Sequence, residues 1–422
     1  MPITRRHFFF LSVLSAINIA GGVALQFSGI LVLGAGVATD AYFAAQAVPM
    51  LLGAILAGAL ANNLTPMLAA LAVPTRAALV RVVMLQMTLP LAALLVLLSV
   101  TAPWWSSFLF FGLPREGQTL FVALFPVMCA TLGVTVITSA GVAGRSAEGK
   151  FWQTEMAQCG ATLVALALAV PVTKNYGMTG FTWLLLLRAL AFFFLVGAPY
   201  LRAETSPVAE HSRVLWYRMA QIMSGSIIFK LGPVLDRALA SLAAPGVITS
   251  LGIGQQIANS VAGVTDKALS RPLLAAAGEH LAANKRKEVI QLYLAQLRMA
   301  RRAAIAVVGF LLVLVVSYAA SEGLANSLNL HAFGRADVII LVSLSALPMA
   351  ASQLSASLMY AIGNPRIISR LATISFLASS ALKVIGFMLV GVYAIIAGVF
   401  LYQILNWVLL HRSAMRLLRH PK

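Results

Sequence analysis

Three charged residues lie inside an apolar stretch of this chain, in the sequence FKLGPVLDRALAS. Lys230 and Arg237 are seven residues apart and share one face of a helix, whereas Asp236 is less well aligned with Lys230. Charges within a membrane span are rare and costly, so each is a candidate site residue. Pro233 can kink the helix and free backbone carbonyls. A kink beside two cations predicts a cavity for phosphate or sugar groups. The alternative is that Asp236 and Arg237 lie at the outer helix end among lipid headgroups.

Three further charges lie in or beside apolar segments. Asp40 follows the first such segment and is predicted to cap the next helix, because Asp is a favoured N-cap residue. The functional alternative is a gate contact with Arg237 or Lys230. Lys383 is isolated and predicted to snorkel outward. Arg188 lies deeper and is a candidate for substrate binding.

Uncharged polar side chains form a second group of candidates, which could hydrogen-bond sugar hydroxyls. Considered one at a time, each is better explained as a hydrogen-bonding contact between helices. The group consists of Gln26, Gln46, Asn62, Asn63, Gln255, Gln256 and Asn259. Of these, we take Gln26, Asn62, Asn63, Gln255 and Gln256 as candidate substrate-binding residues.

Motifs of enzymes and metal sites are missing from the sequence. It has no HExxH, no paired acidic run, no phosphate-binding Gly-rich loop and no Cys/His cluster. Its histidines mostly fall in predicted loops or tails, and Cys129 and Cys159 lie in apolar runs. We therefore expect neither catalysis nor a metal or cofactor.

The composition indicates a polytopic helical membrane protein. Of the 422 residues, 60% are hydrophobic and only 10% are charged, against about 25% charged in soluble domains. The mean hydropathy is +0.92. Continuous apolar runs argue against a β-barrel. The apolar stretch after Arg5, Arg6 and His7 is too long for a signal peptide and is interpreted as the first membrane helix.

Apolar runs long enough to cross a bilayer recur along the chain. They predict about 12 spans, at residues 8–33, 41–72, 82–103, 119–143, 154–172, 179–200, 219–243, 246–270, 302–324, 337–362, 368–389 and 391–410.

The net charge of +18 is placed asymmetrically. With the N-terminus inside, most basic residues fall at cytoplasmic ends, and only Arg115, Lys174 and Arg335 fall on the other face. This positive-inside pattern predicts cytoplasmic N- and C-termini. It explains the positive charge without nucleic acid and predicts contact with anionic lipid headgroups. Residues 277–302 mix apolar and basic positions, and are predicted to form an amphipathic helix on the inner leaflet.

A weak internal repeat links the two halves of the chain. Gly36-Val37-x-Thr39 matches Gly246-Val247-x-Thr249, and Gln46 matches Gln256 at the same offset. Further on, TPMLAA at 65–70 matches RPLLAA at 271–276. Parallel repeats are a known transporter plan. The repeat predicts two six-helix halves, residues 1–210 and 211–422.

The repeated segment also resembles a known family. GAGVATDAYFAAQAVPMLLGAILAGALANNLTPML resembles the second-helix signature of the MurJ/MviN lipid II flippases. These belong to the MOP superfamily, together with the polysaccharide flippases and the MATE exporters. LDRALASLAAPGVITSLGIGQQIANSVAGV resembles the seventh-to-eighth helix hairpin of that group, and the segment from ALPMAASQ to LYQILN resembles its tenth to twelfth helices. Together these matches cover about half of the chain.

The resemblance has departures at the positions that line the family's basic cavity. The family has arginines in its first helix, after the proline of its second, and in an Ala-Asp-Arg run of its eighth. Here the first helix offers Gln26, Pro49 is followed by MLLGA, and the eighth has Gly254, Gln255 and Gln256. The thirteenth and fourteenth helices of the family are not found. The scaffold resembles MurJ, whereas the cavity chemistry is predicted to differ.

Together, these observations predict an all-α polytopic membrane protein, with about 12 transmembrane helices in two six-helix halves around a central cavity. The predicted function is a flippase that moves a lipid-linked saccharide of the undecaprenyl-pyrophosphate type across the bacterial inner membrane by alternating access. The cargo would be a peptidoglycan precursor or a polysaccharide repeat unit. Lys230, Arg237 and Arg188 would meet the anionic headgroup. Asp40 and Asp236 are the candidates for gating or for coupling to a proton or Na⁺.

Two alternatives remain open at this point. One is a MATE-like exporter of small cations, which an acid-rich cavity would favour and the basic in-span charges disfavour. The other is a catalytically silent membrane scaffold of an envelope-synthesis complex. The expected partners are the lipid-linked saccharide, membrane lipids, and glycosyltransferases or a polymerase of an envelope pathway.

Overall fold

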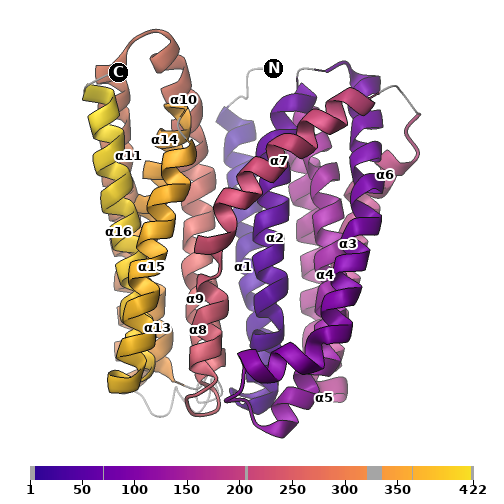
Figure 1. Ribbon diagram of the computed structural model, residues 1–422, viewed down its shortest axis with the longest axis vertical. Helices are drawn as coiled ribbons and strands as arrows, with labels where there is room; N and C mark the ends of the chain where they lie inside the picture. The colour runs from indigo at the N-terminus through magenta and orange to yellow at the C-terminus, as the bar shows by residue number, and fades with distance from the viewer. Residues whose placement is uncertain (1–4, 70, 205–207, 321–334, 364, 420–422) are drawn as a thin grey trace. The chain divides into compact units, whose positions relative to one another are not determined.

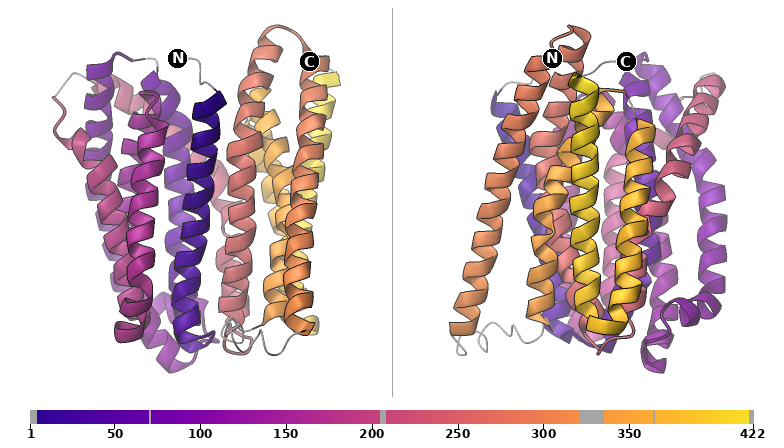
Figure 2. Two further views of the ribbon diagram at one scale, coloured as in Figure 1. Left: turned by 180° about the vertical axis from the view of Figure 1, so that it is seen from behind. Right: turned by 60° about the vertical axis from the view of Figure 1, so that its left-hand side comes forward.

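The computed structural model describes residues 5–69, 71–204, 208–320, 335–363 and 365–419. Within these ranges the chain is almost entirely helical and contains no β-strand. The helices form two compact units, Met1–Pro245 and Gly246–Lys422. Figures 1 and 2 show each unit as a bundle of long helices. Helices α7 and α8 therefore belong to the first unit. The division into six-helix halves at residues 210 and 211 stays a prediction.

The first unit is organised around α2, which packs most extensively against α4 and also contacts α7 and α8. In Figure 1, α7 crosses α2 at a slant before the chain continues into α8. The helices of this unit are α1 (Arg5–Leu33), α2 (Val37–Ala69), α3 (Val73–Leu109), α4 (Arg115–Ala147), α5 (Phe151–Val196), α6 (Ala198–Leu201), α7 (Ala209–Lys230) and α8 (Gly232–Ala240).

The long element α5 is a pair of helices that turn at Gly177. This residue has φ 61° and ψ −153°, a conformation that favours glycine because it has no Cβ. Both ends of α5 lie beside the last turns of α4. Arg145 donates to Gln153 near the start of α5, and a Cβ on Gly141 would lie 3.0 Å from the Val196 carbonyl oxygen near its end. The chain therefore returns to the side from which it started, as the two predicted spans 154–172 and 179–200 require.

The second unit contains α9 (Val247–Thr265), the π-helical turn η1 (Asp266–Ser270), α10 (Arg271–Ala282), α11 (Arg286–Ala320), α13 (Ala336–Leu344), α14 (Ala346–Ala361), α15 (Pro365–Val390) and α16 (Val392–Arg419). Helix α9 packs against α13, while α14 and α15 both pack on α16. Leu354 and Leu358 of α14 and Leu410 of α16 belong to the fully buried core at one end of this unit.

The predicted layout of about 12 spans fits this structure. Within the described residues, seven helices are long and apolar enough to cross a membrane, judged by length and composition. One of the seven is α5, which supplies two spans. The remaining predicted spans correspond to α1, the α7–α8 pair, α9 with η1, and α11.

The predicted amphipathic helix at 277–302 is divided between two helices. These residues belong to α10 and to the start of α11, which continues as one helix to Ala320. Val289 and Tyr293 are fully buried in the core of the second unit, whereas Leu294 and Met299 are exposed. The segment therefore has one face packed on protein, and its place on the inner leaflet stays a prediction.

The two copies of the repeated motif begin their helices at matching residues. Helix α2 begins at Val37 and α9 begins at Val247. Thr39 and Thr249 are both fully buried in the first turn. The Thr39 hydroxyl accepts a hydrogen bond from the Gly36 N–H (2.9 Å). This arrangement supports the predicted repeat and assigns the capping of α2 to Thr39. The prediction that Asp40 is the N-cap is wrong, since Asp40 lies inside the first turn.

A polar cluster ties the turn between α4 and α5 to α6. The Tyr200 hydroxyl donates to Glu148 Oε1 (2.8 Å), and Lys150 Nζ lies 2.8 Å from Glu148 Oε2. Burial opposes ionisation of Glu148, but the hydrogen bonds from Lys150 and Tyr200 and the charges of Lys150 and Arg145 hold its pKa below the ordinary value. The carboxylate therefore stabilises this turn in its ionised form.

Candidate functional site

The break between α7 and α8 turns two cations toward α2. Helix α7 ends at Lys230, and α8 begins at Gly232 with Pro233 in its first turn. This position suits proline because the first helical turn does not need its missing N–H. The predicted kink is therefore present. Lys230 and Arg237 lie on different helices, α7 and α8, and both contact α2.

Arg237 lies deep in the first unit, with 2% of its surface exposed. Its Nη2 lies 3.7 Å from the sulfur of Met50, and its guanidinium carbon lies 6.0 Å from the centroid of the Phe43 ring. Among the residues that the structure describes, Nε and Nη1 have no hydrogen-bond partner. Unpaired buried donors are costly. Arg237 thus retains two donors for a hydrogen-bond acceptor, and burial contradicts the headgroup interpretation.

Lys230 occupies a less enclosed position on the same face of α2. Its Nζ donates to the Ala54 carbonyl oxygen (2.6 Å). The same ammonium lies 3.9 Å from the position that a Cβ would take on Gly58. Helices α7 and α8 therefore supply positive charge to the α2 stretch after Pro49, where the sequence has small and apolar residues.

Tyr42 joins a second arginine to this cluster. It is a buried residue of α2 whose hydroxyl interacts electrostatically with both Arg188 of α5 and Arg237 of α8. Its ring packs edge-on against Phe43 and Phe181. The Tyr42 hydroxyl has no hydrogen-bond partner within the described part of the chain. The predicted cations Arg188, Arg237 and Lys230 are thus gathered around one helix. Sequence reasoning missed Tyr42, since nothing in its spacing distinguishes it from an ordinary core aromatic.

The two predicted acidic residues are both buried. Asp40 and Asp236 each have 3% of their surface exposed. Asp236 precedes Arg237 and interacts with it electrostatically. Asp40 lies in the first turn of α2, where a negative charge is favourable next to the helix N-terminus. Their roles in gating or ion coupling stay predictions.

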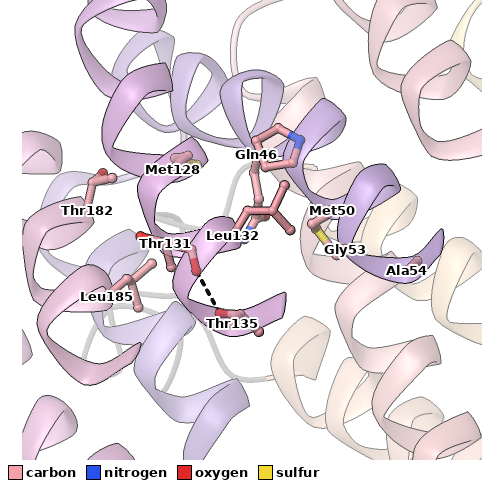
Figure 3. Close-up of a pocket in the computed structure, with 11 residues that line it drawn as sticks. Gln46, Met50, Gly53, Ala54, Met128, Thr131, Leu132, Thr135, Thr182 and Leu185 are labelled. Carbon is pink, nitrogen blue, oxygen red and sulfur yellow. Dashed lines mark hydrogen bonds between the residues drawn. The ribbon is translucent and has the colours of Figure 1, made fainter. Parts of the chain in front are cut away.

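A cavity of about 220 Å³ adjoins the cationic cluster in the first unit. It lies between α2, α4 and the second arm of α5, and Figure 3 shows the side chains around it. Met50 and Ala54, which contact Arg237 and Lys230, also form part of its wall. The other lining residues are Gln46, Pro49, Gly53, Met128, Thr131, Leu132, Thr135, Thr182 and Leu185.

The uncharged polar candidates are dispersed over both units. Gln26 is half-buried in α1, and Asn63 donates to the Ala59 carbonyl of its own helix (2.8 Å). The Asn62 side chain lies outside the described residues. Gln255 and Gln256 are half-buried in α9 of the second unit. Asn63 therefore bonds within its own helix, and the roles of these four residues in substrate binding stay predictions.

The prediction for Lys383 is wrong. This residue of α15 is only 3% exposed, and its alkyl chain lies directly against Gly398 of α16. The missing side chain at Gly398 provides the space that Lys383 fills. Lys383 therefore lies in the interior of the second unit and does not snorkel outward.

One acidic residue within a span was overlooked at the sequence level. Glu155 lies early in α5, and the Asn18 amide of α1 donates to it across 3.5 Å. The Thr162 hydroxyl in turn lies 3.5 Å from Asn18 Oδ1. A lone carboxylate inside the predicted span 154–172 was a recognisable signal, by the same rule that singled out the cations.

The second unit contains a polar network in place of a cation cluster. The Tyr293 hydroxyl lies 2.8 Å from both Ser355 Oγ and His411 Nδ1, and the Tyr293 and His411 rings stack at 5.6 Å. The Asn406 amide donates to Ser352 Oγ (2.7 Å). His411 lies in α16. The network links α11, α14 and α16.

The model of a family described as "Lipid II flippase MurJ" matches residues 31–421. No curated protein matches the sequence. A lipid II flippase MurJ in an inward closed conformation superimposes with a TM-score of 0.75 at 14% identity, over 96% of this chain and 86% of that one.

Transporters of the MOP superfamily have a similar fold. An inward-facing multidrug resistance MATE family transporter superimposes with a TM-score of 0.70 at 17% identity, over 97% of this chain and 96% of that one. A MOP superfamily transporter from Pyrococcus furiosus gives a TM-score of 0.65 at 15% identity, over 98% and 96% of the two chains. At these identities the structural likeness establishes the fold.

Proposed function

This chain belongs to the lipid II flippase MurJ family, and from this premise we propose that it moves a lipid-linked saccharide across the bacterial inner membrane by alternating access. The cargo is of the undecaprenyl-pyrophosphate type, either a peptidoglycan precursor or a polysaccharide repeat unit. Lipid II flippases of this family are membrane transporters. The class of substrate is inferred from the residues of the site.

The observation that best supports this proposal is the state of Arg237. Its guanidinium is buried at the α2 face, and two of its nitrogens lack a hydrogen-bond partner among the described residues. Arginine binds phosphate oxygens through a planar fork of donors. Lys230 on the same face and Arg188 across Tyr42 add positive charge. This arrangement fits a pyrophosphate, which carries several negatively charged oxygens.

The same charges disfavour a MATE-like exporter of small cations. Its cargo would need negative charge in the site, whereas the α2 face presents three cations. We propose that Asp40 or Asp236 couples transport to a proton or Na⁺ gradient. We further propose that both termini are cytoplasmic, and that glycosyltransferases or a polymerase of an envelope pathway act before or after the flippase.

Transport by the purified full-length protein in liposomes tests the proposal. The probe is a fluorescent undecaprenyl-pyrophosphate saccharide placed in one leaflet, with a proton or Na⁺ gradient imposed. We expect the probe to become accessible on the opposite side, and ethidium uptake to stay at the protein-free level. No movement of the probe under either gradient would contradict a flippase, and ethidium uptake would support the exporter instead.

A further inference from the structure

We propose that the cavity between α2, α4 and α5 binds a short hydrocarbon segment of the substrate, namely the isoprenoid units nearest its pyrophosphate. The inference rests on the proposed function and extends it by naming what the cavity holds. The rest of the lipid chain stays in the bilayer.

The lining of the cavity is mostly apolar, and its three threonine hydroxyls already donate hydrogen bonds within their own helices. Thr131 donates to the Val127 carbonyl (2.8 Å), Thr135 to the Thr131 carbonyl (2.7 Å) and Thr182 to the Met178 carbonyl (2.8 Å). Figure 3 shows the Thr131–Thr135 bond as a dashed line. Each threonine hydroxyl has one proton, and all three protons are used within their own helices. The threonines therefore offer an occupant no free hydroxyl donor, only acceptor oxygens.

A saccharide is a poor occupant for such a site. Sugar hydroxyls must be hydrogen-bonded when they leave water, and a buried polar group without a partner is destabilising. Gln46 is the remaining polar side chain of the lining. It lies one helical turn from Met50, on the side of α2 that contacts Arg237. Gln46 is thus placed near the headgroup end of the cavity, and the remaining wall suits hydrocarbon.

The volume is also appropriate for a short apolar segment. An apolar protein cavity of about 150 Å³ binds benzene, so the 220 Å³ present here accommodates a somewhat larger group. A whole undecaprenyl chain is far too long for it. Only a few isoprenoid units fit at a time, and the units attached to the pyrophosphate are the ones that would lie beside the cations.

The cations contact the same residues of α2 that line the cavity. Met50 and Ala54 line the cavity and also contact Arg237 and Lys230, respectively. The stretch of α2 from Met50 to Ala54 therefore borders both the cations and the apolar cavity. A molecule with a pyrophosphate joined directly to an isoprenoid chain can contact both.

The test measures binding of two probes to the full-length protein in nanodiscs: farnesyl pyrophosphate and inorganic pyrophosphate. The principal variant is Gly53→Leu. A Cβ at Gly53 meets only the Cδ1 end of Leu132, at 2.9 Å, and that end can rotate into the cavity. The larger side chain therefore fills the space. Gly160→Leu in α5 is the matched control, since nothing lies within 4 Å of its Cβ position.

We expect farnesyl pyrophosphate to bind wild type roughly tenfold or more tightly than pyrophosphate, because its chain buries apolar surface. Gly53→Leu should remove this difference and leave pyrophosphate binding unchanged, while Gly160→Leu should leave both affinities unchanged. Equal affinities of the two probes in wild type, or an undiminished difference in Gly53→Leu, would overturn the hydrocarbon site. Absence of pyrophosphate binding altogether would instead contradict the proposed function.

A second variant distinguishes hydrocarbon from sugar even if Gly53→Leu fails to fold. Thr131→Val preserves shape and removes the hydroxyl. We expect it to bind farnesyl pyrophosphate as tightly as wild type or more tightly. N-acetylglucosamine 1-phosphate is the competing probe. If it binds more tightly than inorganic phosphate and Thr131→Val weakens it by severalfold, the cavity holds the saccharide and the proposal is wrong.

Discussion

The α2 face of the first unit and the α9 face of the second unit begin with the same motif but have different surroundings. Around α2 lie Arg237, Lys230 and Arg188, with unpaired donors and a cavity. Around α9, Gly254 lets α13 approach closely, and the neighbouring polar network of Tyr293 is hydrogen-bonded. The α2 face therefore has cations beside a cavity that can receive a ligand, whereas α9 is closely packed against α13 at Gly254.

The largest expected effect follows from removing the charge at the α2 face. The double change Lys230→Gln and Arg237→Gln should reduce flipping of the lipid-linked saccharide in liposomes by about tenfold or more, since charge-assisted hydrogen bonds contribute about 1.5–3 kcal/mol. Lys174→Gln, at an exposed position, is the control. Arg237→Lys should retain part of the activity. Wild-type rates in the double variant would show that the α2 face does not bind the headgroup.

A glycine pair tests the difference in packing. A Cβ on Gly254 would lie 2.7 Å from the Val342 Cβ and 2.9 Å from the Ile339 carbonyl oxygen, so Gly254→Ala should destabilise the protein by about 1–3 kcal/mol. Gly53→Ala meets only the movable end of Leu132 and should be nearly neutral. Thermal unfolding of the two variants measures the contrast. Equal losses of stability would remove the distinction between the two faces.

A tyrosine pair tests which hydroxyl is structural. Tyr293→Phe removes hydrogen bonds to Ser355 and His411 and should cost about 1–2 kcal/mol. Tyr42→Phe removes a hydroxyl with no hydrogen-bond partner among the described residues, so stability should stay the same or rise. Unfolding temperatures of both variants provide the measurement. A larger loss in Tyr42→Phe would mean that Tyr42 belongs to the packed framework.

The smallest expected effect concerns Glu148, in the turn between α4 and α5. Its pKa is lowered in the folded protein, so its contribution to stability is present above the unfolded-state pKa and is lost as the pH falls through the folded-state pKa. Glu148→Gln should therefore lower the unfolding temperature slightly at about pH 7 and not at about pH 3. The effect is modest because the Lys150 side chain is 47% exposed. A difference that persists at low pH would assign the effect to packing.

The sequence was sufficient to predict the helical membrane class, because long apolar runs with few charges have no other stable solution in a bilayer. It also identified Lys230 and Arg237 as charges within a span, and Pro233 as a kink, because both follow from residue type and local helix geometry. The repeat placed the starts of α2 and α9 at matching residues for the same reason.

Only the tertiary structure decided which faces are covered. Lys383 was predicted to point outward, but the space beside Gly398 buries it. In the 277–302 segment, Val289 is buried against the core of the second unit while Leu294 and Met299 stay exposed, which the alternation of apolar and basic residues did not distinguish. Tyr42 and the largely apolar lining of the cavity between α2, α4 and α5 could not be predicted either, since both depend on helices distant in sequence. The sequence determines which side chains each helix carries and on which face. Whether a side chain is buried, and what it contacts, depends on the neighbouring helices in the fold.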